Sequence, residues 1–198
     1  MIIRSARAQS SETHRSLPGD DLVPNAHSLT HAITIQRLPR DVWPWLVQMG
    51  AGRAGWYSYD RIDNGGIPSL DRIAPELQEV AVGDVFPAMP GVTEGFIVLG
   101  FHAEHYLILG WPSLRGPDPI MTWTFVLEQT DPGSTRLIVR ARGGAQYRPP
   151  FALPRWTVST LVPLGHAIMQ RKQLLGIARR AEAMREGHGA EISQLVAR

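Results

Sequence analysis

Residues 51–66 read AGRAGWYSYDRIDNGG and bring several chemically versatile side chains into one short stretch. Tyr57, Tyr59 and Asp60 supply two hydroxyls and a carboxylate, groups that can orient a carbonyl or move a proton. The alternative interpretation is packing, in which Trp56 and a tyrosine anchor the segment and Asp60 caps a helix or pairs with an arginine. We prefer packing, and a role as a pocket wall is compatible with both interpretations.

His166 is a second candidate for proton transfer, because an unperturbed imidazole titrates near neutral pH. Packing at the margin of a helix is the commoner role of such a histidine. The stretch HAEH, residues 102–105, has the ligand types of a metal site, but it falls in a tight turn where adjacent side chains diverge. The chain has no cysteine, which removes thiolate nucleophiles and cysteine metal sites. We therefore expect neither a metal site nor a cofactor.

Hydrophobic periodicity predicts the elements that position these residues. SLTHAITIQRL alternates apolar and polar residues, the pattern of a first strand. RDVWPWLVQMG places apolar residues at helical spacing, and Pro44 fits the first turn if Asp41 caps that helix, whereas an earlier start would kink it. A second short helix is predicted from about Trp56 to Asn64, ended by Gly65.

The chain after residue 82 changes to strand patterns. VGDVFPA, GFIVLGF and YLILGW are short strands, and MTWTFVLEQ with TRLIVRARG forms a hairpin whose TDPGS turn suits proline and glycine geometry. The sheet is expected to be antiparallel, with five or six strands. Its outer face, which carries Arg136, Arg140 and Arg142, is expected to be solvated.

A long amphipathic helix is predicted from about residue 163 to residue 187, with an apolar stripe that must cover the sheet. That stripe comprises Leu164, Ala167, Ile168, Leu174, Leu175, Ala178, Ala181 and Met184. The predicted fold class is α+β, a curved antiparallel sheet wrapped around this C-terminal helix. The two short helices after the first strand hold the long helix away from the sheet, and the leftover volume becomes a cavity.

Composition is that of an ordinary globular protein, with 198 residues, 43% hydrophobic residues and a formal net charge of +2. We expect an extended or partly disordered lead-in over residues 1–28, strapped down through Leu17, Leu22 and Val23. One domain follows over residues 29–187, and then a flexible tail over 188–198. No apolar run is long enough for an integral membrane segment, no stretch reads as a signal peptide, and the basic residues are scattered. We expect a cytoplasmic protein that binds no nucleic acid.

Four stretches and the order of the elements carry a resemblance to a known superfamily: VWPWLVQMGAGRAGWYSYDRIDN, PELQEVAVGDV, TWTFVLEQTDPGSTRLIVRARG and MQRKQLLGIARRAEA. They resemble the START-like (SRPBCC, polyketide cyclase/dehydrase-like) superfamily with the helix-grip fold, and within it a bacterial subgroup with no assigned activity. The likeness covers roughly residues 28–184. It implies an internal cavity, with the short-helix segment at one mouth, rather than a particular catalytic set.

Two functions follow, and the lining of the cavity decides between them. The first is binding of an apolar, partly oxygenated small molecule, such as a lipid, polyketide or isoprenoid-like compound, without a cofactor. The alternative is a cyclase, aromatase or dehydratase in which Tyr57, Tyr59, Asp60 or His166 moves protons. An adaptor that binds a protein or a membrane is a weaker third option, and a homodimer is left open. The predicted ligand-binding residues are Trp45, Met49, Trp56, Tyr57, Tyr59, Asp60, Trp123, Phe125 and Met169.

Overall fold

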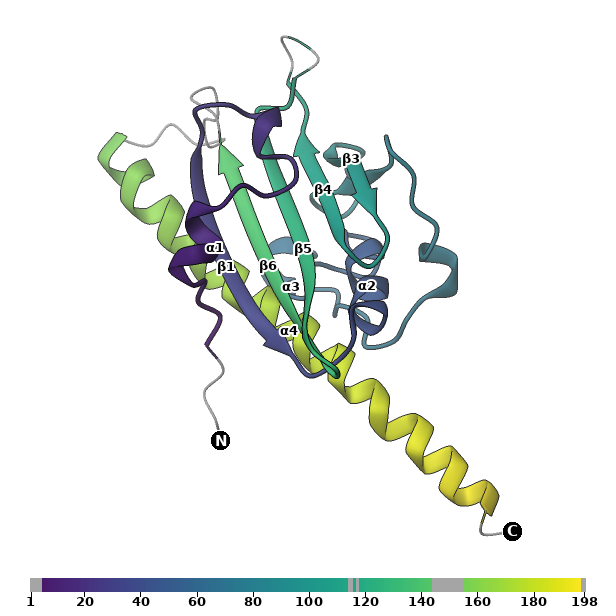
Figure 1. The fold of residues 1–198 in the computed structure, drawn as a ribbon. Coiled ribbons are helices and arrows are strands. Elements are labelled where there is room, and N and C mark those ends of the chain that lie inside the picture. Colours follow the sequence, from purple (N-terminus) through teal and green to yellow (C-terminus); the bar gives the residue numbers. More distant parts are fainter. Residues whose placement is uncertain (1–4, 114–115, 117, 144–154, 197–198) are drawn as a thin grey trace.

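The computed structural model describes residues 5–113, 116, 118–143 and 155–196. Its centre is a sheet of six antiparallel strands in the order β1-β6-β5-β4-β3-β2. The strands are β1 (His27–Ile35), β2 (Val85–Pro87), β3 (Gly95–His102), β4 (Tyr106–Trp111), β5 (Met121–Asp131) and β6 (Ser134–Gly143). The sheet twists and curves across a long C-terminal helix, α4 (Arg155–Val196) (Figure 1). The predicted α+β class and the strand pattern are therefore confirmed.

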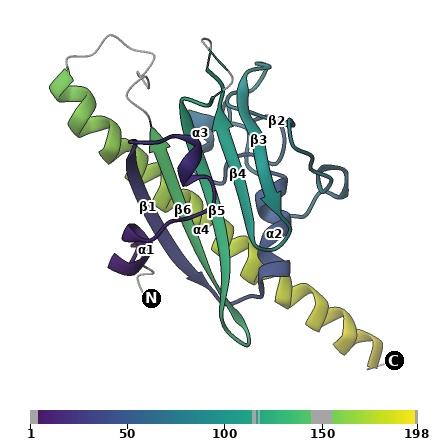
Figure 2. The same ribbon diagram turned by 45° about the horizontal axis from the view of Figure 1, so that its top comes forward.

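The β5–β6 hairpin forms the middle of the sheet, with Phe125 opposite Val139. β1 joins the other side of β6, where Ile33 lies opposite Leu137. These four side chains are buried on the face that α4 covers, as the alternation in the sequence predicts. Figure 2 shows α4 crossing behind the strands and extending beyond the sheet.

The helix α2 (Pro39–Val47) buries Val42, Trp45 and Leu46 against the same core. It begins earlier than an Asp41 cap would allow, so that cap is wrong. Pro44 consequently lies inside the helix rather than in its first turn.

The helix predicted over Trp56 to Asn64 is mostly wrong, because α3 covers only Asp60–Asp63. Tyr57 has φ 60°, a left-handed conformation that cannot continue a right-handed helix. Gly176 of α4 lies so close that a Cβ there would overlap the Tyr57 carbonyl. The residues before α3 are therefore an irregular loop pressed against α4, and η2 (Pro75–Leu77) adds a single 3₁₀ turn further on.

The helix α4 begins eight residues before Pro163, the predicted start, so proline does not mark its N-terminus. The predicted stripe also differs: Leu164 is 56% exposed and Ile168 is 50% exposed. The side chains directed at the sheet are instead polar in the first half and apolar further along. They include Gln170, Gln173, Leu174, Ile177, Ala178 and Ala181, all of which are buried. Within the part of the chain that the structure describes, no helix has the length and hydropathy needed to cross a membrane.

The outer face of the sheet is covered by the N-terminal segment, which contains α1 (Ser10–His14) and η1 (Asp20–Leu22) (Figure 1). Leu17 packs with Ala32, Val126 and Ile138 in a second apolar cluster on this face. Val23 is also buried, whereas Leu22 is exposed.

The prediction of a solvated arginine face is wrong. Arg140 is 2% exposed and contacts Asp20 at 2.5 Å, and it also donates to the carbonyl oxygens of Thr13 (3.2 Å) and Arg15 (2.9 Å). Arg136 pairs with Glu12, with Nε 2.7 Å from Oε1. The arginines that alternate outward from β6 therefore fasten residues of the N-terminal segment to the sheet.

Candidate functional site

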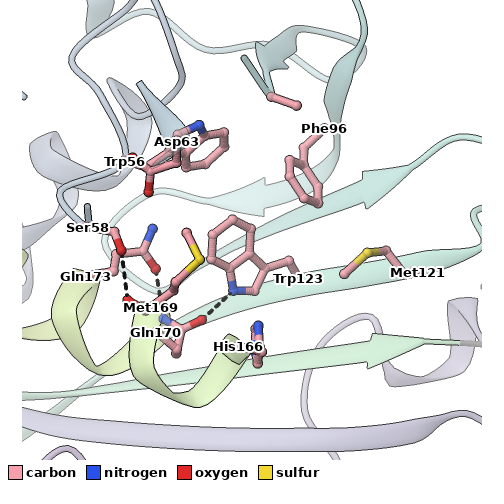
Figure 3. Close-up of a pocket in the computed structure, with 11 residues that line it drawn as sticks. Trp56, Ser58, Asp63, Phe96, Met121, Trp123, His166, Met169, Gln170 and Gln173 are labelled. Atoms are coloured by element: carbon pink, nitrogen blue, oxygen red, sulfur yellow. Dashed lines mark hydrogen bonds between the residues drawn. The ribbon is translucent and has the colours of Figure 1, made fainter. Parts of the chain in front are cut away.

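A cavity of about 240 Å³ lies between the sheet and α4 (Figure 3). Its walls come from four parts of the chain: the loop and helix α3, the segment after β2, the strands β3 and β5, and the first half of α4. The lining residues are Trp56, Ser58, Asp63, Ala88, Phe96, Met121, Trp123, His166, Met169, Gln170 and Gln173.

One wall of the cavity is aromatic. The rings of Trp56 and Trp123 have centroids 5.4 Å apart, and that of Phe96 lies 5.7 Å from Trp56 and 5.2 Å from Trp123. Two further rings flank this group: the Trp111 centroid lies 5.2 Å from that of Phe96, and the Phe125 centroid lies 5.0 Å from that of Trp123. The loop before α3 thus brings Trp56 onto two strands, and the three rings form a continuous apolar surface.

The opposite wall is formed by polar side chains of α4. The Trp123 Nε1–H donates to Gln170 Oε1 (3.0 Å), and Gln170 Nε2 donates to Gln173 Oε1 (2.8 Å). Gln173 Nε2 contacts the sulfur of Met49 at 3.7 Å, and Ser58 Oγ–H donates to the Met169 carbonyl (3.1 Å). This chain of hydrogen bonds fixes the amide groups and the Trp123 indole in place.

His166 lies on the same wall as Gln170, near Trp123 (Figure 3). Its Nε2 is shielded from solvent and has no hydrogen-bond partner among the described residues. Its ring meets the edge of His31 with centroids 5.9 Å apart. Burial, reinforced by His31, lowers the pKa of His166 to about 4, so the imidazole is neutral at neutral pH.

Asp63 enters the cavity from α3, beside Trp56 (Figure 3). Its Oδ1 is shielded from solvent and, within the described part of the chain, accepts no hydrogen bond. Burial, with a smaller contribution from the Asp60 carboxylate, raises the pKa of Asp63 to about 6. The cavity therefore contains an acid and an imidazole, each with one polar atom that has no hydrogen-bond partner among the residues that the structure describes.

Tyr57 does not line this cavity, although it was a catalytic candidate. Its hydroxyl accepts a hydrogen bond from Gln48 Nε2 (2.8 Å), and the Arg180 guanidinium lies 4.7 Å from its ring centroid. Trp45 meets the ring edge-on at 5.9 Å. Burial raises the pKa of the Tyr57 phenol far above its ordinary value, so the hydroxyl stays protonated.

Tyr59 and Asp60 lie on the other side of the loop, away from the cavity lining. Tyr59 is 40% exposed, with the Lys172 ammonium 5.8 Å from its ring centroid. Asp60 accepts a hydrogen bond from Ser69 Oγ (2.5 Å), and Ser69 Oγ accepts one from the Tyr57 N–H (3.1 Å). This arrangement holds the irregular loop in shape.

The remaining predicted ligand-binding residues divide into two groups. Trp56, Trp123 and Met169 line the cavity together with His166. Trp45, Met49 and Phe125 are fully buried in the adjoining core and support the cavity from behind. Sequence reasoning missed the lining residues Ser58, Asp63, Ala88, Phe96, Met121, Gln170 and Gln173.

The sequence contains a signal for some of the lining residues that were not predicted. His166, Met169, Gln170 and Gln173 have the spacing i, i+3, i+4, i+7, so they share one face of α4. That face continues into the apolar residues Leu174, Ile177, Ala178 and Ala181. A polar beginning to an otherwise core-facing stripe indicates a solvated or ligand-filled volume.

The HAEH turn lies far from this site in the connection between β3 and β4. His102 and His105 are exposed, and the Nδ1 of each lies within 3.2 Å of the Ala103 carbonyl oxygen. Within the described ranges, no group of three or more His, Asp or Glu side chains is arranged to hold a metal ion.

Comparison with solved structures addresses the fold. A protein from Mesorhizobium loti, MLL2253, superposes with a TM-score of 0.50 at 17% identity, over 79% of this chain and 98% of its own. This likeness concerns the fold alone, a curved antiparallel sheet that crosses a long C-terminal helix. Weaker similarities include the polyketide-cyclase-like protein Cgl2372 from Corynebacterium glutamicum, with a TM-score of 0.40, 14% identity and coverage of 84% and 98%. Norcoclaurine synthase from Thalictrum flavum also gives 0.40 and 14%, with coverage of 84% and 92%.

No protein-family model matches the sequence, and no curated protein matches it either. The arrangement of the sheet and α4 confirms the predicted helix-grip fold. Activity has to be argued from the residues of the cavity.

Proposed function

We propose that this protein binds an apolar, partly oxygenated small molecule in the cavity between the sheet and α4. The observation that carries the proposal is the pairing of an aromatic wall with unpartnered polar atoms on Asp63 and His166. Buried polar groups in proteins are normally hydrogen-bonded, so two unpartnered ones at the same cavity favour a ligand that supplies the partners.

The size of the cavity narrows the class of ligand. An apolar cavity of about 150 Å³ is enough to hold benzene. The volume here, about 240 Å³, therefore suits a compact molecule with one or two rings better than a long acyl chain. Oxygen substituents on such a molecule would reach the His166 imidazole or the amides of Gln170 and Gln173.

A second function, acid–base catalysis of a cyclisation or dehydration, is favoured by one specific observation. Asp63, with its pKa raised to about 6, can exchange a proton near neutral pH, and His166 is a neutral base in the same cavity. Tyr57 and Tyr59 are less suited to this role because neither lines the cavity. Asp63 and His166 therefore replace the tyrosines as the candidate pair.

Isothermal titration with 2-naphthol tests the proposed binding, because this probe combines two fused rings with one hydroxyl. We expect saturable binding at one site. Ala88→Trp fills the cavity from the segment after β2 and should abolish the binding. Tyr59→Phe is the matched control on the loop, and its affinity should equal that of the unchanged protein. Equal affinity in the Ala88→Trp variant would place the binding elsewhere and contradict the proposal.

A further inference from the structure

The cavity contains a carboxylate that no cation of the described residues neutralises. Asp63 makes no ion pair within the described residues, and the charged group that most affects it is Asp60, which has the same sign. Elsewhere in the same molecule buried carboxylates are paired, as Glu12 is with Arg136. Hydrogen bonds from Ser58 and from the backbone of Tyr59 and Asp63 offset only part of the cost of keeping this half-buried carboxylate charged, because its pKa is still raised. Its presence at a cavity therefore points to a positive charge supplied from outside.

The groups that face Asp63 come from each neighbouring element. Its own helix contributes Asp60, and α4 contributes His166, which is neutral at neutral pH. Lys172 of α4 stands over the Tyr59 ring on the other side of the loop, in a pocket that it shares with Asp60. The strands β3 and β5 contribute only Phe96, Met121 and Trp123 to the lining, none of which titrates.

The aromatic wall provides the second half of a cation site. Trp56, Phe96 and Trp123 line the same cavity as Asp63, and the face of an aromatic ring attracts a cation through its quadrupole. Arg180 and Arg53 already stack on other rings, those of Tyr57 and Phe86, and neither lines this cavity. The three rings beside Asp63 are therefore available to a cation carried by a ligand.

We propose that the ligand is a small aromatic amine whose ammonium group pairs with Asp63 and contacts the rings of Trp56 and Trp123. This inference rests on the proposed binding function and specifies the charge of the ligand. The aromatic ring of the amine fills the apolar volume, and an oxygen substituent at its far end reaches His166 or Gln170. A carboxylic acid of the same shape is repelled by the same carboxylate.

Three probes of nearly equal shape and different charge test this inference: 2-phenylethylammonium, 2-phenylethanol and 3-phenylpropanoate. Isothermal titration at pH 7.5 should show the ammonium binding at least tenfold more tightly than the alcohol, with the carboxylate weakest. At pH 5.0, one unit below the pKa of Asp63, only about a tenth of the carboxyl groups are ionised. The affinity for the ammonium should then fall roughly tenfold, while that for the alcohol stays constant.

Asp63→Asn should remove the preference for the ammonium at pH 7.5, and Asp71→Asn, at an exposed aspartate, should preserve it. The pH series on the unchanged protein gives the same information without a substitution. An alcohol that binds as tightly as the ammonium overturns the inference and leaves the proposed binding function standing. Failure of all three probes to bind counts against both.

Discussion

The two faces of the sheet treat buried charge in opposite ways. On the outer face, Arg136 and Arg140 reach carboxylates and carbonyl oxygens of the N-terminal segment, and the segment is held in place by these bonds. On the face toward α4, Asp63 and His166 are shielded from solvent but have polar atoms without protein partners. On the outer face Asp20 Oδ1 and Arg142 Nε also lack a hydrogen-bond partner among the described residues, but the charges there face charges of opposite sign. Asp63 has no such counterpart within the described part of the chain.

This difference indicates which buried polar groups stabilise the fold and which are candidates for ligand binding. A buried ion pair holds two segments together, because removing one partner leaves the other desolvated and unpaired. An unpartnered polar group lowers stability, and at a cavity it favours a ligand that supplies the missing partner. The comparison therefore places the N-terminal segment in the framework of the fold and supports the proposal that the cavity binds a ligand.

The largest expected effect lies on the outer face. Arg140→Ala would remove one ion-pair partner of Asp20 and the guanidinium donor of the Glu12, Thr13 and Arg15 carbonyl oxygens. We expect the free energy of unfolding to fall by about 3–5 kcal/mol, as for other broken buried pairs. Urea denaturation measures the change, and Arg61→Ala, at an exposed position, should cost less than about 0.5 kcal/mol. A loss below about 1 kcal/mol for Arg140→Ala would contradict the framework role of this face.

A smaller effect should appear on the cavity side, as opposite dependences of stability on pH. The pKa of His166 is about 4 in the folded protein, against 6.5 for an unperturbed histidine, so protonation favours unfolding and stability falls as pH falls from 7 to 4.5. The pKa of Asp63 is about 6, against 3.8 for an unperturbed aspartate, so ionisation favours unfolding and stability falls as pH rises across the same window. The His166 contribution is about 2 kcal/mol, and the Asp63 contribution is about 1 kcal/mol because solvent screens this half-buried group, so the two oppose each other.

Single substitutions should separate these contributions. Relative to the unchanged protein, Asp63→Asn should become more stable by about 1 kcal/mol as pH rises from 4.5 to 7, because the His166 contribution is no longer opposed. His166→Gln should show the reverse slope. Thermal or urea unfolding at several pH values measures both, and parallel pH profiles for the three proteins would show that these groups are not desolvated in the folded state.

The strands and the class of fold could be predicted because local pattern and tertiary environment agree there. The β5–β6 hairpin has a turn sequence and an alternation that lead to one register, in which Phe125 and Val139 face the core. The loop before α3 was wrongly predicted as a helix. Tyr57 has φ 60° and lies against Gly176, a residue more than a hundred positions away in the sequence. Such a contact leaves no local signature in the sequence.

The existence of the cavity was predicted from the sequence, but only some of its lining residues were. Amphipathic analysis assigned Leu164 and Ile168 to the sheet because they are apolar, whereas both are about half exposed. The face that meets the cavity carries Gln170 and Gln173, which a hydrophobic stripe cannot identify. The wrong prediction for Arg140 has a similar cause. An arginine on the outward face of a strand is expected to be solvated unless the segment that covers it is known.

Nuclear magnetic resonance of the protein labelled with ¹⁵N-tryptophan tests the central claim most directly, that the hollow between sheet and α4 receives a ligand. Each tryptophan gives one indole N–H signal, and Trp56 and Trp123 line the cavity while Trp45 is enclosed in the core and Trp43 packs beside Phe101. On titration with 2-naphthol we predict saturable shifts for Trp56 and Trp123, with Trp43 and Trp45 much less affected. Shifts confined to Trp43, or no saturable shift at either cavity tryptophan, would contradict the account.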